Sequence, residues 1–127
     1  RRCGWVDLVQ LRYACRINGF TSLAVTKVDV LGGLKTIPIA TKYKYKNSYI
    51  TELPADLEIT RQCKPVYKEL PGWKNLTDAD FQTIITHGYK ALPSKMKNYL
   101  DFIADQTNTP LSLVSVGAER KSTIQVP

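Results

Sequence analysis

The tetrapeptide Thr26-Lys27-Val28-Asp29 carries side chains that can select a nucleotide base. It follows the apolar run Leu23-Ala24-Val25, so we expect it at the end of a buried strand. Guanine presents two adjacent N–H donors, and the Asp29 carboxylate offers two acceptors at matching spacing in a charge-assisted pair. Adenine lacks both donors and would leave the carboxylate unpaired, while the methylene stem of Lys27 can lie along the base. The alternative interpretation is an ordinary charge pair at a strand end.

A second expected strand end carries the sequence Ser115-Val116-Gly117. In open α/β sheets, ligands sit beyond the carboxyl ends of the strands. A Ser-x-Gly turn there can direct backbone N–H groups at an acceptor such as O6 of guanine, and Gly117 permits close backbone approach. Ser-x-Gly alone is also an ordinary loop sequence, so both interpretations stay open.

No set of residues in the sequence is typical of phosphoryl transfer. A Gly-x-x-x-x-Gly-Lys-Ser/Thr phosphate-binding loop is absent, and the only histidine, His87, is expected at a helix end. Four aspartates are expected as helix-surface charges: Asp78, Asp80, Asp101 and Asp105. The three cysteines form no C-x-x-C pair and indicate small buried residues of a reducing, intracellular protein: Cys3, Cys15 and Cys63. We therefore expect neither catalytic nor metal-binding residues in this chain.

The elements that must position these groups alternate between helix and strand. We expect a helix over residues 7–18, capped by Asp7 with Ile17 on its apolar face, and helices capped by Thr77 and by Ser94. Strands are expected over residues 21–30, 37–45, 49–51, 65–70, 111–116 and 123–126, with a loop over 54–64. Pro38 indicates an edge strand because proline lacks a backbone donor. This order predicts an α/β, or mixed α+β, chain that forms one domain over residues 1–127 without an internal boundary.

The net charge of +7 lies entirely in residues 1–50, which hold nine Lys and Arg against Asp7 and Asp29. Such an excess suits a phosphate-bearing partner. It equally suits the solvated face of an edge strand in which Lys42, Lys44 and Lys46 alternate with tyrosines. No apolar run approaches the roughly 18 residues of a membrane span. No signal peptide is visible, and the missing initiator Met suggests a chain that begins inside a larger protein.

Four runs, in matching order and spacing, resemble the carboxyl-terminal portion of the adenylosuccinate synthetase family: Arg1-Arg2-Cys3-Gly4-Trp5-Val6-Asp7, Ile17-Asn18-Gly19-Phe20, Thr26-Lys27-Val28-Asp29-Val30-Leu31 and Leu70-Pro71-Gly72-Trp73. The likeness continues through residues 115–117 to the end of the chain. The resemblance implies part of a larger P-loop-NTPase-like α/β enzyme whose strands end in a guanine-binding pocket.

The resemblance also implies an activity. It indicates a GTP-dependent ligase of purine and AMP biosynthesis that joins IMP and L-aspartate into adenylosuccinate, with GDP, phosphate and a requirement for Mg²⁺. In this family the phosphoryl group passes to the 6-oxygen of IMP, and the aspartate amine then displaces it. A cytoplasmic homodimer is implied, with neither a membrane nor a nucleic acid as partner.

The family's motif is Gly-Arg-x-Arg-Arg-x-Gly-Trp, and this chain begins at the second arginine of that motif. Arg1 therefore corresponds to the arginine that contacts GTP. Lys27 and Asp29 match the guanine-recognition pair, with Val28 where leucine is usual. The second guanine loop matches Ser115, Val116 and Gly117, with Val116 where bacterial members have Thr.

The family's phosphate loop, catalytic Asp and His, Mg²⁺ site and most IMP contacts lie upstream of this chain, so we expect the fragment to be inactive alone. A basic nucleic-acid-binding module and a purely structural fragment are the alternative hypotheses. A steep salt dependence of binding would identify the nucleic-acid-binding module.

Overall fold

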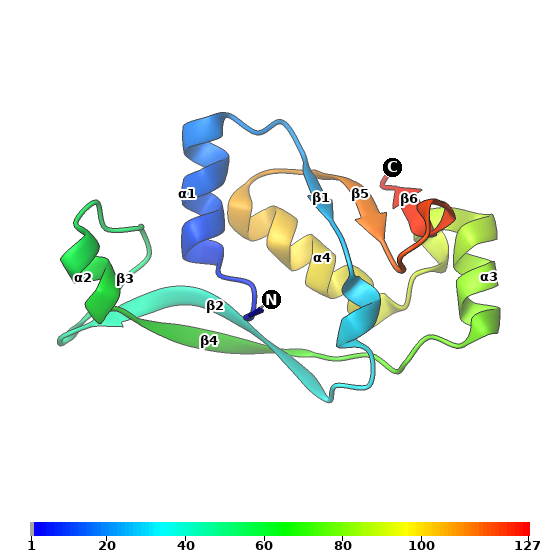
Figure 1. Ribbon diagram of the computed structural model, residues 1–127, viewed down its shortest axis with the longest axis horizontal. Coiled ribbons are helices and arrows are strands. Elements are labelled where there is room, and N and C mark those ends of the chain that lie inside the picture. Colours follow the sequence, from blue (N-terminus) through cyan, green and yellow to red (C-terminus); the bar gives the residue numbers. More distant parts are fainter. Residues whose placement is uncertain (1) are drawn as a thin grey trace. The chain divides into compact units, whose positions relative to one another are not determined.

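The computed structural model describes residues 2–127, whose helices and strands form a mixed α+β chain (Figure 1). The helices are α1 (Leu8–Asn18), α2 (Leu57–Gln62), α3 (Asp78–His87) and α4 (Ser94–Thr107), with 3-10 helices η1 (Val28–Leu31), η2 (Gly88–Ala91) and η3 (Arg120–Ser122). The strands are β1 (Leu23–Val25), β2 (Thr36–Tyr45), β3 (Ser48–Ile50), β4 (Lys64–Pro71), β5 (Leu111–Ser115) and β6 (Thr123–Gln125). The mixed α+β class predicted from the sequence is confirmed.

The described residues form two compact units. The first unit combines the described part of Arg1–Phe20 with Pro38–Leu70, and the second unit combines Thr21–Ile37 with Pro71–Pro127. Each unit is therefore built from two separate stretches of sequence. That residues 1–127 have no internal domain boundary stays a prediction.

Helix α1 of the first unit begins and ends where the sequence predicts. Oδ1 of Asp7 accepts hydrogen bonds from the backbone N–H groups of Val9 and Gln10, at 2.9 and 3.2 Å. Gly19 ends the helix in the left-handed conformation, with φ 61°. Ile17 was predicted on the buried face but is 58% exposed. It lies about 200° around the helix from the buried Cys15, because successive residues differ by about 100°.

The sheet of the first unit has the order β3-β2-β4. The predicted hairpin is confirmed, with Lys44 opposite Tyr49. The prediction that Pro38 marks an edge strand is wrong, because β2 is the middle strand. Proline is tolerated there because β3 pairs only with residues 43–45 of β2. The predicted loop over 54–64 contains α2, whose first turn is capped by the Asp56 carboxylate, which accepts from the Glu58 N–H at 2.8 Å.

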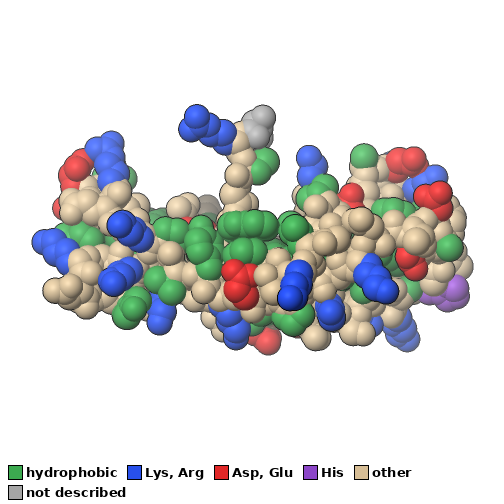
Figure 2. Space-filling view, turned by 90° about the horizontal axis from the view of Figure 1, so that it is seen from below, with side chains coloured by type: hydrophobic (Ala, Val, Ile, Leu, Met, Phe, Trp, Pro, Cys, Tyr) green, Lys and Arg blue, Asp and Glu red, His purple; other side chains and the backbone are tan. Residues whose placement is uncertain are grey.

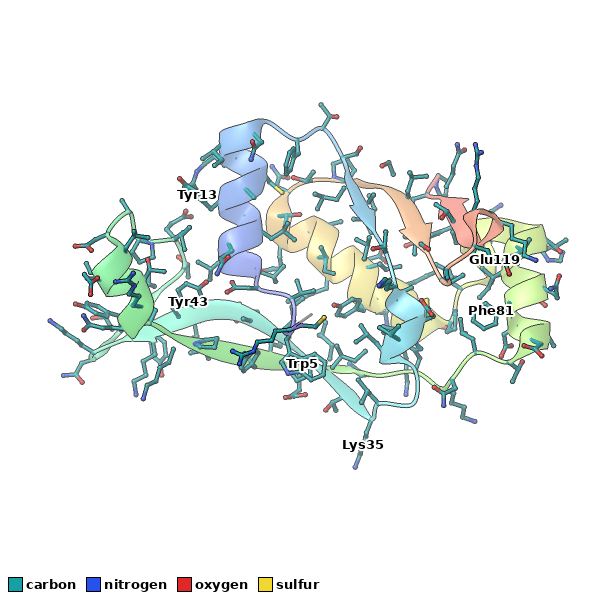
Figure 3. The ribbon with its side chains drawn as sticks, in the orientation of Figure 1. Trp5, Tyr13, Lys35, Tyr43, Phe81 and Glu119 are labelled. Atoms are coloured by element: carbon teal, nitrogen blue, oxygen red, sulfur yellow. The ribbon has the colours of Figure 1, made fainter. Side chains whose placement is uncertain are left out.

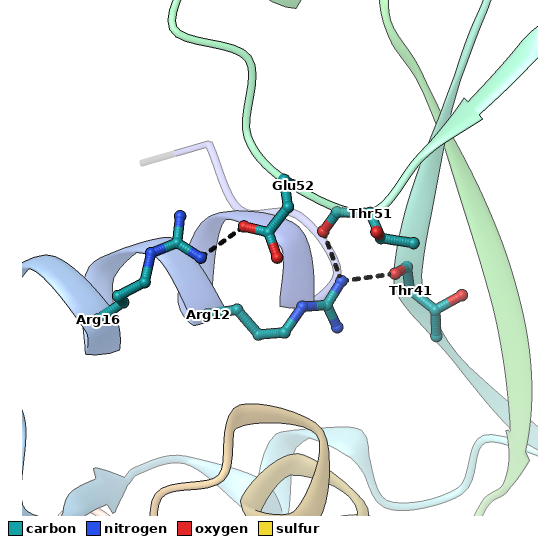
Figure 4. A network of polar contacts seen from close by, with 5 residues as sticks. All are labelled: Arg12, Arg16, Thr41, Thr51 and Glu52. Carbon is teal, nitrogen blue, oxygen red and sulfur yellow. Dashed lines mark hydrogen bonds and ion pairs between the residues drawn. The ribbon is translucent and has the colours of Figure 1, made fainter.

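Two arginines on the polar side of α1 bind the neighbouring strands (Figure 4). Arg12 Nη2 donates to the carbonyl oxygens of Thr41 and Thr51, at 2.9 and 3.0 Å. Arg16 pairs with Glu52 at 2.6 Å, but both side chains are largely exposed, so this ion pair contributes little to stability. Arg12 is therefore the stronger link between α1 and the hairpin.

The sheet of the second unit has the order β1-β5-β6, with β1 parallel and β6 antiparallel to β5. The predicted strand over residues 21–30 is much shorter, because the chain leaves β1 at Thr26 and enters η1 at Val28. The strands predicted near residues 111–116 and 123–126 are confirmed as β5 and β6.

Helices α3 and α4 complete the second unit. The Thr77 hydroxyl accepts from the Asp80 N–H, and the Asp80 carboxylate accepts from the Thr77 N–H, which is the predicted capping box of α3. Ser94 was predicted to cap α4 but is its first residue, after Pro93. The predicted apolar stripe of α4 is buried, with Met96, Tyr99, Leu100 and Ile103 all at most 3% exposed.

Candidate functional site

The two predicted nucleotide-binding segments follow neighbouring strands of the second unit. β1 and β5 pair in parallel, with Val25 opposite Val114. Residues 26–29 and 115–117 therefore leave the sheet at the same edge, and η1, which contains Asp29, contacts β5. The structure thus brings together the two segments that the sequence assigned to one site.

Asp29 lies in η1, where one of its carboxylate oxygens has no hydrogen-bond partner. Val28 beside it is 1% exposed and anchors the 3-10 helix in the core. Oδ1 of Asp29 is buried and accepts no hydrogen bond from any residue in 2–127. A buried acceptor without a partner costs about 1–3 kcal/mol, and more when it is charged. Oδ1 of Asp29 is therefore an acceptor that the described residues leave unsatisfied.

The chain changes direction at Lys27, between β1 and η1. Its backbone has φ 60° and ψ 35°, the left-handed conformation, which is uncommon for a residue with a Cβ. This conformation costs roughly 1–2 kcal/mol, and strain of this kind is concentrated at functional sites. The Lys27 side chain is exposed at the same edge as Asp29.

Two donors of the Ser115–Gly117 loop are already engaged within the protein. The Ser115 hydroxyl donates to the Gly117 carbonyl at 2.8 Å, and the Val116 N–H donates to the Ser122 carbonyl at 2.9 Å. The prediction that this turn directs its N–H groups at a ligand is therefore wrong for Val116, because its N–H already donates to Ser122. The Val116 side chain is fully buried, so valine acts there as a core residue.

Ser122 closes this loop, and sequence reasoning missed it. A Cβ on Gly117 would lie 2.9 Å from the Ser122 Oγ, so a larger residue there would have to displace the Ser122 side chain. Ser122 is 7% exposed and accepts from Val116 through its carbonyl. No signal in the sequence identifies it, because any residue type can supply a backbone carbonyl.

A cavity of about 190 Å³ opens beside this loop, between α3 and η3. Phe81 and Glu119, labelled in Figure 3, lie on facing elements of its wall, and Ser122 also lines it. Glu119 forms an ion pair with Lys121 at 2.9 Å, and both side chains are largely exposed. The mouth of the cavity thus carries both signs of charge.

Arg1 lies outside the described residues. His87 is exposed at the end of α3, as predicted, and its Nδ1 lies 3.1 Å from the Thr83 carbonyl oxygen. Of the cysteines only Cys15 is buried, so the prediction of three buried thiols is wrong for the exposed Cys3 and the half-buried Cys63. All four helix aspartates are exposed.

A metal site, a membrane-spanning helix or a basic patch would each leave a recognisable feature in residues 2–127. No three His, Cys, Asp or Glu side chains there come together as metal ligands would. No helix in this part of the chain combines the length and apolar character that a membrane crossing requires. On the face seen in Figure 2, the Lys and Arg side chains are separated by other atoms and do not merge into one patch.

Comparison with known proteins gives one consistent result. The family model described as adenylosuccinate synthetase matches residues 1–124. The chain is 49% identical over 125 residues to adenylosuccinate synthetase of Carboxydothermus hydrogenoformans, covering 98% of this chain and 28% of that protein. It is 46% identical over 126 residues to adenylosuccinate synthetase of Gloeobacter violaceus, covering 99% of this chain and 27% of that protein.

A solved structure agrees with these relatives. The chain matches the fully ligated adenylosuccinate synthetase from Plasmodium falciparum with a TM-score of 0.82 and 34% identity, over 100% of this chain and 30% of that one. The chain thus spans less than a third of the length of the proteins it matches. It belongs to the adenylosuccinate synthetase family.

Proposed function

We propose that this chain is the guanine-recognition part of a GTP-dependent ligase of purine and AMP biosynthesis. The whole protein would join IMP and L-aspartate into adenylosuccinate, with GDP and phosphate as the other products. Family membership supports the reaction. The site at the shared edge of β1 and β5 supports the role of this portion.

A single observation carries the assignment of base recognition, namely the unpaired buried oxygen of Asp29. Guanine supplies N1–H and the 2-amino group side by side, which matches a carboxylate that accepts through both oxygens. The exposed Lys27 can cover the base with its methylene stem. Gly117 would complete the pocket with its backbone, and Arg1 would contact the nucleotide from outside the described residues.

The remaining groups of the reaction would be supplied by other parts of the protein. The sequence has no phosphate-binding loop of the Gly-x-x-x-x-Gly-Lys-Ser/Thr kind. We therefore assign the phosphates of GTP, the Mg²⁺ ion and most contacts to IMP and L-aspartate to residues outside this chain. The whole protein would work as a cytoplasmic homodimer, and the 127 residues alone would be inactive.

The nucleic-acid-binding alternative began from the lysines of β2 and the hairpin. In the structure two of the three lysines contact tyrosines of their own hairpin, with Lys42 Nζ 4.3 Å from the Tyr49 ring centroid and Lys46 Nζ 5.2 Å from that of Tyr45. Cation–π contacts of this kind are common on protein surfaces. They give Lys42 and Lys46 a local role, and family membership favours the ligase.

The substitution Asp29→Asn in the full-length protein tests the proposal. We expect the preference for GTP over ATP, measured as the ratio of kcat/KM values, to fall roughly ten- to hundred-fold, because hydrogen bonds to a charged group are worth about 1.5–3 kcal/mol each. Asp105→Asn, on the exposed side of α4, is the matched control and should leave the ratio unchanged. Unchanged discrimination in Asp29→Asn would show that Asp29 does not read the base.

A further inference from the structure

The segment Gly72–Asn75 of the second unit packs against the turn that follows Asp29. At the end of η1 the Gly32 N–H donates to the Asp29 carbonyl at 2.9 Å, and the Gly33 N–H donates to the Trp73 carbonyl at 2.8 Å. The Gly72 N–H in turn donates to the Lys35 carbonyl at 2.9 Å. Two backbone hydrogen bonds therefore tie this segment to the turn that closes the Asp29 helix.

Gly72 lies so close to the backbone of Leu34 that a side chain at position 72 would not fit. A Cβ there would lie 1.9 Å from the carbonyl oxygen of Leu34, which belongs to the backbone and cannot rotate away. Figure 3 shows the Lys35 side chain pointing away from the ribbon. The contact is thus made by backbone against backbone, and only glycine permits it.

The carboxamide of Asn75 lies against both glycines of the turn. A Cβ on Gly32 would lie 2.9 Å from Asn75 Oδ1, and one on Gly33 would lie 3.2 Å from Asn75 Nδ2. Trp73, which lies between Gly72 and Asn75 in the sequence, is 4% exposed and meets the Tyr99 ring edge-on, with 5.6 Å between the ring centroids. A buried tryptophan therefore anchors the segment that braces the turn.

We propose that Gly72–Asn75 is a positioning segment for Asp29 and sets how strongly the site distinguishes guanine from bases without a 2-amino group. The proposal rests on the proposed role of Asp29 in base recognition. Two parallel hydrogen bonds to one carboxylate form only when both oxygens are aligned with both donors. A small displacement of η1 therefore weakens this pair, while contacts to the phosphates are unaffected. Asn75 is a positioning residue that acts through Asp29.

The experiment compares GTP with inosine triphosphate, which lacks the 2-amino group, in the full-length protein. Asn75→Ala should lower the GTP-to-ITP ratio of kcat/KM values about five-fold, a size typical of coupling between neighbouring residues. The change should lie in the KM for the nucleotide, with the KM for IMP unchanged. Asn98→Ala, on the exposed side of α4, is the matched control and leaves the ratio unchanged.

A double variant separates positioning from a general loss of structure. When Asp29→Asn has already removed the carboxylate, adding Asn75→Ala should lower the ratio no further, because there is no carboxylate left to align. An additive loss in the double variant overturns the proposal. Gly72→Ala is the second positioning variant and should lower the ratio at least as much as Asn75→Ala; if it does not fold, Asn75→Ala still decides.

Base recognition by Asp29 and its positioning by Gly72–Asn75 are contradicted by different results. If Asp29→Asn lowers the ratio but Asn75→Ala does not, the positioning role is wrong and base recognition by Asp29 stands. If Asp29→Asn leaves the ratio unchanged, base recognition is wrong and the positioning role falls with it.

Discussion

At the scale of single residues, Tyr43 of β2 and Asp7 before α1 link the stability of the first unit to pH. The Tyr43 hydroxyl donates to the Asp7 carboxylate. Burial, followed by this hydrogen bond, raises the pKa of Tyr43 from 10.0 to about 12. The folded protein therefore keeps the phenol proton up to about pH 12, while the unfolded chain releases it near pH 10. The stabilisation is complete below pH 10 and is lost as the pH rises from 10 to 12.

We expect Tyr43→Phe to be less stable than the unchanged protein at pH 9, because the partly buried Asp7 loses its donor. The fall in stability between pH 10 and 12 should become shallower in this variant. It should not vanish, because burial also raises the pKa values of Tyr89 and Tyr99 to about 12. Urea unfolding at several pH values measures both effects, with the exposed Tyr49→Phe as control. Parallel pH profiles for Tyr43→Phe and the unchanged protein would contradict the assignment.

The site residues show the limit of reasoning one residue at a time. The sequence indicates Asp29 from its type and its position after an apolar run. Its unpaired oxygen becomes visible only in the structure, because pairing depends on every group that surrounds it. The role of Ser122 also cannot be predicted from its residue type, because it acts through its backbone carbonyl.

At the scale of elements, the caps of α1 and α3 could be predicted from the sequence. Asp7, Gly19 and the Thr77–Asp80 capping box act where the sequence indicates, because a cap joins a side chain to backbone only two or three residues away. The errors concern the cap of α4, where Ser94 is the first helical residue, the missed helix α2, and the strands. β1 ends early, before the left-handed Lys27. Pro38 is tolerated in the middle strand β2 because the neighbouring β3 is short and pairs only with residues 43–45. Strand pairing depends on distant partners, so local patterns predict it less well.

The two caps give a prediction about their relative strengths. Thr77→Ala should cost about 1 kcal/mol of unfolding free energy, the usual value for an exposed cap. Asp7→Ala should cost about 2–3 kcal/mol, because it removes a cap and also leaves the buried Tyr43 hydroxyl without its acceptor. Denaturant unfolding of the two variants measures the difference. Equal losses would mean that the Tyr43 contact contributes nothing beyond the cap.

At the scale of the whole molecule, the chain covers less than a third of the length of its relatives. The edge formed by β1 and β5 brings together groups suited to a base. The phosphate groups of a nucleotide need backbone N–H groups or cations in a cradle. We therefore propose a division in which this chain binds the base of the nucleotide and the rest of the protein binds its phosphates.

Isothermal titration of the 127-residue chain tests this division. We expect weak or undetectable GTP binding, because the phosphate loop is missing, and no preference for GTP over guanosine. The full-length protein should bind GTP and should prefer it to guanosine. Micromolar binding of GTP by the 127 residues alone would contradict the division of labour.

The sequence by itself determined several features that depend on nearby residues: the caps of α1 and α3, the hairpin, the buried stripe of α4 and the order of motifs that marks the family. Only the tertiary structure decided which distant groups meet. It engaged the Val116 N–H with Ser122, left Asp29 Oδ1 without a partner and pressed Gly72 against Leu34. The physical reason is that caps and periodicity follow from local backbone geometry, whereas long-range contacts follow from the packing of the whole unit.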